Sequence, residues 1–432
     1  MEPPPISCPC AVFDIAFNSR ADVLAIALVD GSVSLHSVSR GGAPPKALAS
    51  STPHNASIRS LRFSADGSSL ICASADGVVS LLDSTGAAVW RGGTSGSTPV
   101  NVVEPMGSGG IFAAGDESGA VKIWDSRAAG AGAPRPVTFE KQEDVITALL
   151  WDAARGTLLA ASGDGTLGVY DLRKAPGKLA ARTAPDGEEL LSLAALKSGA
   201  LAVAGTQDGV LLSWDWGAWG DESRGVSGGA KRFTGHPESI DAMLVIDDDT
   251  LVTGSSDGLI RLVTVAPNKL VGIIGEHGDE DDPVERLAWS RDRSIIASTG
   301  HDDTVRFWDV AYLFEDDEDD DGGTTTTRGH ASGAAASRVK TRKRFVDLPA
   351  LPLPRTGSRS AVDLGDDSDD DDEEDFDDDD DDMCDGPELA GGAAGGGAAP
   401  APTRALKQNK KKETKGKGKR SATSNVKFDG LD

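Results

Sequence analysis

Apolar and polar residues alternate along many short stretches in the first three quarters of the chain. In the segment TVRFWDV, for example, Val305 and Phe307 flank Arg306. A period of two places one face of a β-strand in a core. No segment keeps a 3.6-residue helical period over two or three turns. The pattern therefore predicts an all-β protein built from short strands.

One pattern recurs seven times: an apolar strand, small residues, an Asp-Gly-like turn, an alternating strand and an aromatic residue often followed by Asp. The copies read LALVDGSVSLHSV, CASADGVVSLLDS, AAGDESGAVKIWDS, AASGDGTLGVYDLR, VAGTQDGVLLSWDW, VTGSSDGLIRLVTV and ASTGHDDTVRFWDV. Their turns begin at Asp30, Asp76, Ser118, Asp164, Asp208, Asp257 and Asp302. Asp-Gly supplies the positive φ of a tight hairpin, and a further alternating strand, such as Ile58–Phe63 or Ile240–Val245, precedes a copy.

This repeat predicts a β-propeller. Four-stranded sheets with two apolar faces can cover both by stacking radially, and a period of about 40–45 residues ending in Trp-Asp is typical of that fold. We expect seven blades within residues 11–313. After the last Trp-Asp only Ala311–Phe314 precedes an acidic run, too little for an outer strand. Residues 1–10, through Pro4–Pro9, are therefore expected to close the ring as a short edge strand.

A structural network of His, hydroxyl, carboxylate and aromatic side chains is typical of these repeats and satisfies polar groups inside a blade. We assign to it His54, His236, His277, Asp76, Asp164, Asp208, Asp257, Asp302, Trp124, Trp214 and Trp308. Ser74, Ser162, Thr206 and Ser255 are the expected hydroxyls, and Tyr170 replaces a Trp. All of these are expected to be structural rather than catalytic.

No catalytic or metal-binding motif stands up to inspection. Residues 254–258 match G-x-S-x-G, but that motif needs a strand-to-helix turn and here lies between two strands. The chain has no phosphate-binding G-x-x-x-x-G-K-[ST] and no H-E-x-x-H. Cys8 and Cys10 lack a second Cys or His pair at ligand spacing. We expect a binding platform, not an enzyme, with no cofactor and no metal.

Composition separates the end of the chain from the rest. The formal net charge is -26, yet residues 314–432 hold none of the eight Trp and are rich in Asp, Gly, Ala, Thr and Lys. We expect a disordered tail there, acidic at 315–321 and 366–385 and basic at 338–344 and 404–420. No apolar run is long enough for a membrane span, and the N-terminus lacks the features of a secretory signal. Four cysteines in 432 residues favour a reducing compartment.

The tail's charge blocks suggest interactions. Its basic residues, expected to serve nuclear or nucleolar targeting or weak, non-specific RNA contact, are Arg338, Lys340, Arg342, Lys343, Arg344, Lys410, Lys411 and Lys412. Ser368, followed by four Asp and two Glu, is a candidate phosphorylation site for an acid-directed kinase. The acidic block would suit basic ribosomal proteins or histones, or would serve solubility alone.

Several segments are not generic to the repeat: LLAASGDGTLGVYDLRK (158–174), SWDWGAWG (213–220), residues 239–290 and ASTGHDDTVRFWDVA (297–311). Together they resemble the WD repeat-containing protein 55 family of WD40 proteins, with its fungal Jip-type relatives, and the likeness covers about residues 10–313. The resemblance implies a nucleolar scaffold in ribosomal RNA processing and large-subunit biogenesis, with ribosome-assembly factors as partners. Nucleus and nucleolus are the implied locations, with the cytoplasm as a further one, and we expect a monomer.

Plant members of that family are also linked to cullin-4 ubiquitin ligases through WDxR motifs. Two such motifs stand here: Trp124-Asp125-Ser126-Arg127, and Tyr170-Asp171-Leu172-Arg173 with Tyr in place of Trp. The alternative function is thus a substrate receptor that docks the ligase adaptor through these residues. A plainer interpretation stays open, in which each Arg only pairs with its neighbouring carboxylate at the surface.

Overall fold

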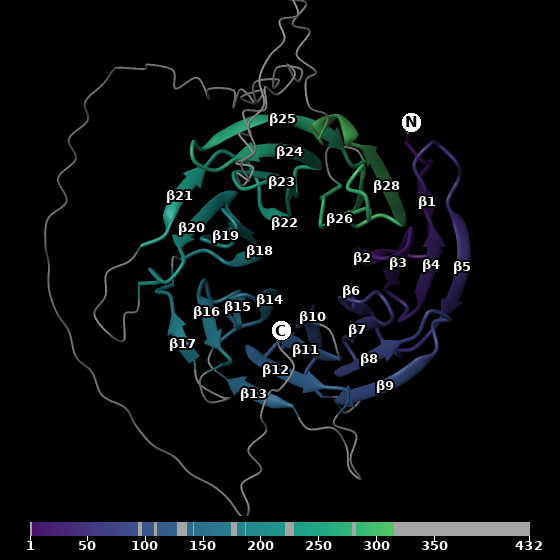
Figure 1. Ribbon diagram of the computed structural model, residues 1–432, viewed down its shortest axis with the longest axis horizontal. Helices are drawn as coiled ribbons and strands as arrows, with labels where there is room; N and C mark the ends of the chain where they lie inside the picture. The colour runs from purple at the N-terminus through teal and green to yellow at the C-terminus, as the bar shows by residue number, and fades with distance from the viewer. Residues whose placement is uncertain are drawn as a thin grey trace, which may run out of the picture. The chain divides into compact units, whose positions relative to one another are not determined.

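The computed structural model describes residues 2–314, apart from 94–96, 108–109, 128–135, 141, 174–178, 186, 221–228 and 279–281. Seven four-stranded antiparallel sheets form a closed ring, as Figure 1 shows. The predicted all-β, seven-bladed propeller is confirmed. The tail predicted for 314–432 lies, beyond Phe314, outside the described residues.

The strands have the following bounds. Blade 1 consists of β2 (Val12–Phe17), β3 (Val23–Leu28), β4 (Val33–Ser37) and β5 (Lys46–Ser51). Blade 2 consists of β6 (Ile58–Phe63), β7 (Leu70–Ser74), β8 (Val78–Leu82) and β9 (Ala88–Gly93). Blade 3 consists of β10 (Val100–Pro105), β11 (Ile111–Asp116), β12 (Ala120–Asp125) and β13 (Val137–Glu140). Blade 4 consists of β14 (Ile146–Asp152), β15 (Thr157–Ser162), β16 (Leu167–Asp171) and β17 (Leu179–Arg182).

The remaining blades follow the same plan. Blade 5 consists of β18 (Leu190–Leu196), β19 (Leu201–Thr206), β20 (Val210–Asp215) and β21 (Lys231–Thr234). Blade 6 consists of β22 (Ile240–Val245), β23 (Thr250–Ser255), β24 (Leu259–Thr264) and β25 (Lys269–Glu276). Blade 7 consists of β26 (Arg286–Trp289), β27 (Ile295–Thr299), β28 (Thr304–Asp309) and the N-terminal β1 (Ile6–Ser7). A 3-10 helix, η2 (Ala311–Phe314), follows β28.

The N-terminal segment supplies the outer strand of the last blade. Ile6 lies opposite Val305, and the Cys8 N–H donates to the Asp303 carbonyl at 2.7 Å. Glu2 accepts a hydrogen bond from the Asp309 N–H at 3.2 Å. β1 is only two residues long because the prolines ahead of it have no N–H to donate to a ladder. The ring is therefore closed by pairing the N-terminal strand β1 with β28, the last strand of the described chain.

Glycine makes the turn between the second and third strands possible. Six of the seven turns place a Gly at positive φ: Gly31, Gly77, Gly119, Gly165, Gly209 and Gly258. At Gly31 a Cβ atom would also lie 2.5 Å from the His54 carbonyl oxygen, so both conformation and space require glycine. The seventh turn, at Asp302–Asp303, does without one.

The core lies between blades rather than within one sheet. One cluster joins Val121, Ile123 and Phe139 of blade 3 to Leu158 and Tyr170 of blade 4. The second strand of a blade is the most deeply covered element, and every residue of β11, β15, β19 and β23 is buried. Each blade thus buries its faces against its neighbours, as the radial-stacking argument expects.

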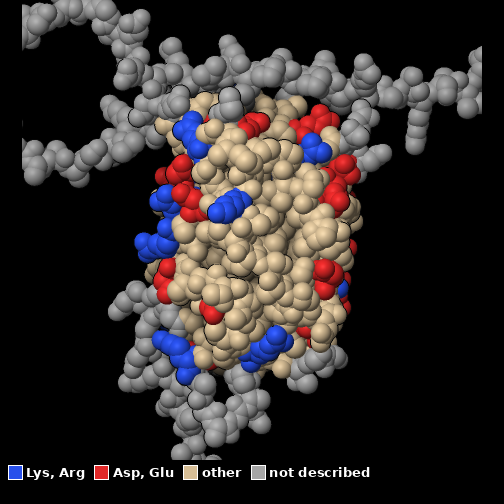
Figure 2. All heavy atoms as spheres, turned by 90° about the vertical axis from the view of Figure 1, so that its right-hand side faces the viewer, with Lys and Arg blue, Asp and Glu red and all other residues tan. Residues whose placement is uncertain are grey.

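The connections define two faces of the ring. The turn face carries the seven turns between second and third strands and the beginnings of the first, innermost strands. The tail face carries the ends of those inner strands, the connections between third and fourth strands, and Phe314. The rim between the faces, seen in Figure 2 from the side of β1 and β5, is largely uncharged, with charged side chains gathered toward the margins of the view. No helix among the described residues is long and apolar enough to cross a membrane.

Candidate functional site

The polar network predicted from the repeat is complete in blade 7. The His277 ring accepts a hydrogen bond from the Ser298 hydroxyl at 2.7 Å and donates to Asp302 at 3.3 Å. The Trp308 indole N–H donates to the same Ser298 oxygen at 2.8 Å. His277 is fully buried. Four side chains from four positions of the blade thus satisfy one another, as the structural assignment expects.

Two other histidines use different hydroxyl groups from those expected. His54 donates to Asp76 at 3.1 Å and accepts from Ser80 at 2.7 Å, whereas Ser74 donates to the Ala56 carbonyl. His236 pairs with Thr253 at 2.8 Å rather than with Ser255. Asp257 is bound by Arg261 at 2.8 Å and not by His236. Ser74 and Ser162, each two residues before a turn, instead accept a hydrogen bond from the backbone N–H of the turn residues Asp76 and Asp164.

Blade 4 replaces the histidine with Gln142. Its side-chain amide donates to the carbonyls of Ala160 and Thr166, both at 3.1 Å, and the Tyr170 hydroxyl donates to its amide oxygen at 3.3 Å. Gln142 lies 22 residues before Asp164, the same spacing as His54 before Asp76. That spacing is the signal by which the sequence could have identified it.

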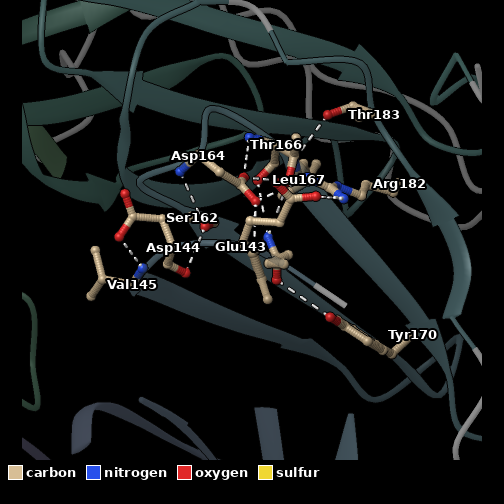
Figure 3. Close-up of polar contacts among 12 residues, drawn as sticks. Glu143, Asp144, Val145, Ser162, Asp164, Thr166, Leu167, Tyr170, Arg182 and Thr183 are labelled. Carbon is tan, nitrogen blue, oxygen red and sulfur yellow. Dashed lines mark hydrogen bonds and ion pairs between the residues drawn. The ribbon is translucent and has the colours of Figure 1, made fainter. Parts of the chain in front are cut away.

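Asp164, assigned to the network, holds the turn of blade 4. It accepts the backbone N–H groups of Glu143 at 2.8 Å and Thr166 at 2.9 Å, and a hydrogen bond from Arg182 at 3.0 Å. Figure 3 shows Glu143, Thr166 and Arg182 converging on this carboxylate. The hydroxyl oxygen of Ser162, on β15, accepts a hydrogen bond from the Asp164 N–H at 3.2 Å and so stabilises the same turn. The carboxylate is occupied by structural partners.

In blade 5 the network differs from the one expected. Asp208 is exposed at its turn, and the Thr206 hydroxyl donates to Glu188 at 2.9 Å instead. Glu188 also binds Arg232. The assignment of Asp208 to the internal network is therefore corrected: Glu188, on the connection before the inner strand, supplies the carboxylate. Trp214 of the same blade is buried in the core.

Burial sets the protonation of these groups. Desolvation lowers the pKa of His54 and His277, with Asp76 and Asp302 opposing it, and it lowers the pKa of His236 to about 4. Burial also raises the pKa of the Tyr170 hydroxyl. Burial thereby favours the neutral form of each of these groups. Ser255, of the G-x-S-x-G match, is fully buried at a strand-to-strand turn. In the part of the chain that the structure describes, no group of three or more His, Cys, Asp or Glu could hold a metal.

The two WDxR-like motifs build equivalent structures on neighbouring blades. Arg127 follows β12, and its Nε and Nη2 atoms donate to the two carboxylate oxygens of Asp125 at 2.9 and 3.0 Å. Arg173 follows β16 and makes the same fork with Asp171 at 3.1 and 3.2 Å. Both follow the third strand of a blade, so both lie on the tail face. We call Arg127 and Arg173 the arginine pair.

Of the aromatic and arginine side chains in these motifs, only the arginines are exposed to solvent. The side chains of Arg127 and Arg173 are 50% and 59% exposed. Trp124 and Tyr170 are 4% and 0% exposed and belong to the core, Trp124 packing edge-on against Trp90 with ring centroids 5.6 Å apart. They are not available for docking as the motif suggested. The hydrogen bond from Arg127 holds the pKa of the Asp125 carboxyl below its usual range, so the fork stays charged and oriented.

The predicted tail residues lie outside the described part of the chain. This applies to Arg338, Lys340, Arg342, Lys343, Arg344, Lys410, Lys411, Lys412 and the phosphorylation candidate Ser368. Cys8, Cys10 and Cys72, in contrast, are described, and all three are free thiols.

Comparison with known proteins identifies the family. A family model described as WDR55 matches residues 3–313. The chain is 34% identical over 300 residues to "WD repeat-containing protein 55" of Rattus norvegicus, covering 69% of this chain and 74% of that protein. It is 34% identical over 325 residues to the protein of that name in Arabidopsis thaliana (75% and 85%), and 34% identical over 348 residues to "WD repeat-containing protein JIP5" of Malassezia globosa (70% and 80%). The chain belongs to the WD repeat-containing protein 55 family.

Proposed function

We propose that this WD40 scaffold acts in the nucleolus, in ribosomal RNA processing and the assembly of the large ribosomal subunit. The observation that carries the proposal is the family match, which runs over residues 3–313 and so includes the whole ring. The sequence resemblance to that family implies this role. The acidic and basic blocks after residue 314 suit partners that are themselves basic proteins or RNA.

The chemistry of the ring supports a binding role. Buried His and Asp side chains, which could otherwise do acid–base chemistry, are tied to one another inside the blades, as at His277 and Asp302. What the ring offers to other molecules is two broad faces and a rim on a rigid frame. Such a surface holds several partners in a fixed geometry without reacting with them.

Recovery of partners tests this proposal. The tagged full chain is purified from growing cells, and the proteins bound to it are identified by mass spectrometry. We expect large-subunit assembly factors, and we expect depletion of the chain to cause accumulation of large-subunit RNA precursors. Normal precursor levels after depletion, with no assembly factor recovered, would contradict the proposal.

A second candidate function is supported by the arginine pair. Two exposed guanidinium groups, each held by a carboxylate in the same fork, lie on adjacent blades of one face. Arg is enriched at the centres of protein interfaces, and an oriented fork loses little freedom on binding. We therefore propose docking of a cullin-4 ligase adaptor here as the alternative, with the chain as substrate receptor.

A double variant tests the second candidate. Arg127→Ala with Arg173→Ala should abolish recovery of the adaptor while leaving the melting temperature nearly unchanged, because exposed residues contribute little stability. Arg291→Ala is the matched control, since Arg291 makes the same fork with Asp22 on the tail face of another blade. Undiminished recovery of the adaptor with the double variant would remove the ligase function.

A further inference from the structure

The two ends of the central opening differ in polarity. The inner strands surround that opening in Figure 1. Near the turn face they contribute mainly polar and charged residues, among them Arg59, Asn101, Thr147, Asp241 and Glu285, and the cavity there holds about 100 Å³. Three of these five side chains line that cavity. Apolar side chains such as Leu149, Leu193 and Met243 line the same cavity, so this end offers mixed rather than purely apolar contacts.

At the tail face all seven inner strands contribute an apolar residue. Strand register places these residues at one equivalent position, and each is half-buried: Phe17, Phe63, Pro105, Trp151, Ala195, Val245 and Trp289. Four of the seven are aromatic. We call this set the apolar mouth. A ring of partly exposed apolar side chains at one end of the propeller is typical of a docking site.

The described chain ends at this surface. Helix η2 turns under blade 7 after β28, with Leu313 buried. The Phe314 ring then packs edge-on against Trp289, with centroids 5.8 Å apart and an interplanar angle of 67°. Trp289 is itself a member of the apolar mouth. Phe314, the last described residue, therefore lies beside the apolar mouth.

The sequence after Phe314 contains a segment that matches an aromatic surface. Residues 345–352 read FVDLPALP, with four large apolar side chains and two prolines in eight positions. Leu and Pro side chains on an extended, proline-rich backbone pack well on aromatic side chains. Thirty residues separate Phe314 from Phe345. A flexible linker of that length spans about 30 Å on average and gives an effective concentration on the order of millimolar.

We propose that the apolar mouth is a docking surface for this chain's own segment Phe345–Pro352. Docking removes the partly exposed aromatic residues from water and costs little entropy, because the segment is tethered to the ring. It also brings the basic cluster 338–344 to the tail face and leaves the turn face open. The proposal is independent of the proposed cellular function.

Site-specific cross-linking in the full chain tests the docking. A photoreactive p-benzoylphenylalanine replaces Leu351, and in a matched chain it replaces Leu389, another apolar tail residue. We expect the probe at 351 to attach within its own chain to peptides that contain Phe63, Trp151 or Trp289. Its yield there should exceed that of the probe at 389 by about tenfold, given the gain from a specific contact.

A second variant removes the contact without touching the ring. Val346→Asp with Leu348→Asp, in the chain carrying the probe at 351, should lower the yield to that of the probe at 389. Because both substitutions lie outside the ring, failure to fold does not confuse the result. Equal yields from 351 and 389, attachment to the turn face, or attachment to a second copy of the chain would each overturn the proposal.

Discussion

The buried histidines of the ring make its stability depend on pH. Burial lowers the pKa of His236 to about 4, from the ordinary histidine value of about 6.5. Between those two pH values the unfolded chain therefore binds more protons than the folded one. The contribution of His236 to the free energy of unfolding is complete above pH 6.5. It is lost as the pH drops toward 4, which lowers the free energy of unfolding by up to about 3 kcal/mol. His54 and His277 act in the same direction.

The variant His236→Gln should flatten that dependence. Urea unfolding of the full chain at a series of pH values between 7 and 4 measures the slope directly. The amide of Gln can still pair with Thr253 and does not titrate, so we expect a smaller loss of stability on acidification. An identical slope in the variant and the natural chain would show that His236 does not contribute.

Gln142 gives a second test at the scale of one residue. Gln142→Ala removes a hydrogen bond from each of the Ala160 and Thr166 carbonyls and leaves the Tyr170 hydroxyl without its acceptor, while the Thr166 carbonyl still accepts from the Ser162 N–H. A buried polar group left unsatisfied costs about 1–3 kcal/mol, so we expect a loss of about that size. Glu143→Gln is the control, because the neighbouring Glu143 side chain is 83% exposed. Equal stability of the two variants would contradict the assigned role of Gln142.

The sequence predicted the strands better than it predicted the hydrogen-bond partners of their side chains. The inner strands Ile58–Phe63 and Ile240–Val245 have the bounds that alternation indicated. The hydroxyl partners of His54 and His236 could not be predicted, because two hydroxyl residues per blade lie near the turn and only packing decides which one meets the imidazole. Glu188 and Gln142 were missed because they replace the usual residue with another type. The motif alone also could not show that Trp124 and Tyr170 are enclosed.

At the scale of the element, ring closure depends on a strand of two residues. Ile6 is buried against Val305 and Phe307 of the last blade. We expect Ile6→Ala to lower the free energy of unfolding by about 2–4 kcal/mol, because it opens a cavity in that cluster. Deletion of residues 1–10 should lower the melting temperature further, through lost backbone hydrogen bonds.

The neighbouring residue supplies the control for closure. Ser7 is exposed on the same strand, so Ser7→Ala should change the stability by less than about 0.5 kcal/mol. Thermal unfolding of the three variants and the natural chain measures the effect. An unchanged melting curve for the deletion would mean that the last blade does not need its N-terminal strand.

At the scale of the molecule, charge predicts which part of the chain contacts RNA. The chain carries a formal net charge of -26, so contact with a phosphate backbone has to come from the basic clusters after residue 314. Substituting Lys410, Lys411 and Lys412 by Gln should weaken RNA binding by the full chain. It should also reduce the slope of log affinity against log salt by about 2, at about 0.7 per phosphate contact.

A charge-conserving variant separates charge from sequence in that experiment. Replacement of the same three lysines by Arg should leave both the affinity and the salt slope nearly unchanged. Filter binding of single-stranded RNA at several salt concentrations measures both quantities. An unchanged slope after substitution by Gln would place the RNA contacts elsewhere.

The most direct test of the scaffold role compares two purifications from the same cells. The tagged natural chain and the Arg127→Ala, Arg173→Ala variant are recovered in parallel, and the bound proteins are quantified by mass spectrometry. Large-subunit assembly factors should be recovered with both, since the proposed scaffold role does not depend on the arginine pair. Recovery of a ubiquitin-ligase adaptor and its cullin in place of assembly factors, lost in the variant, would contradict the account.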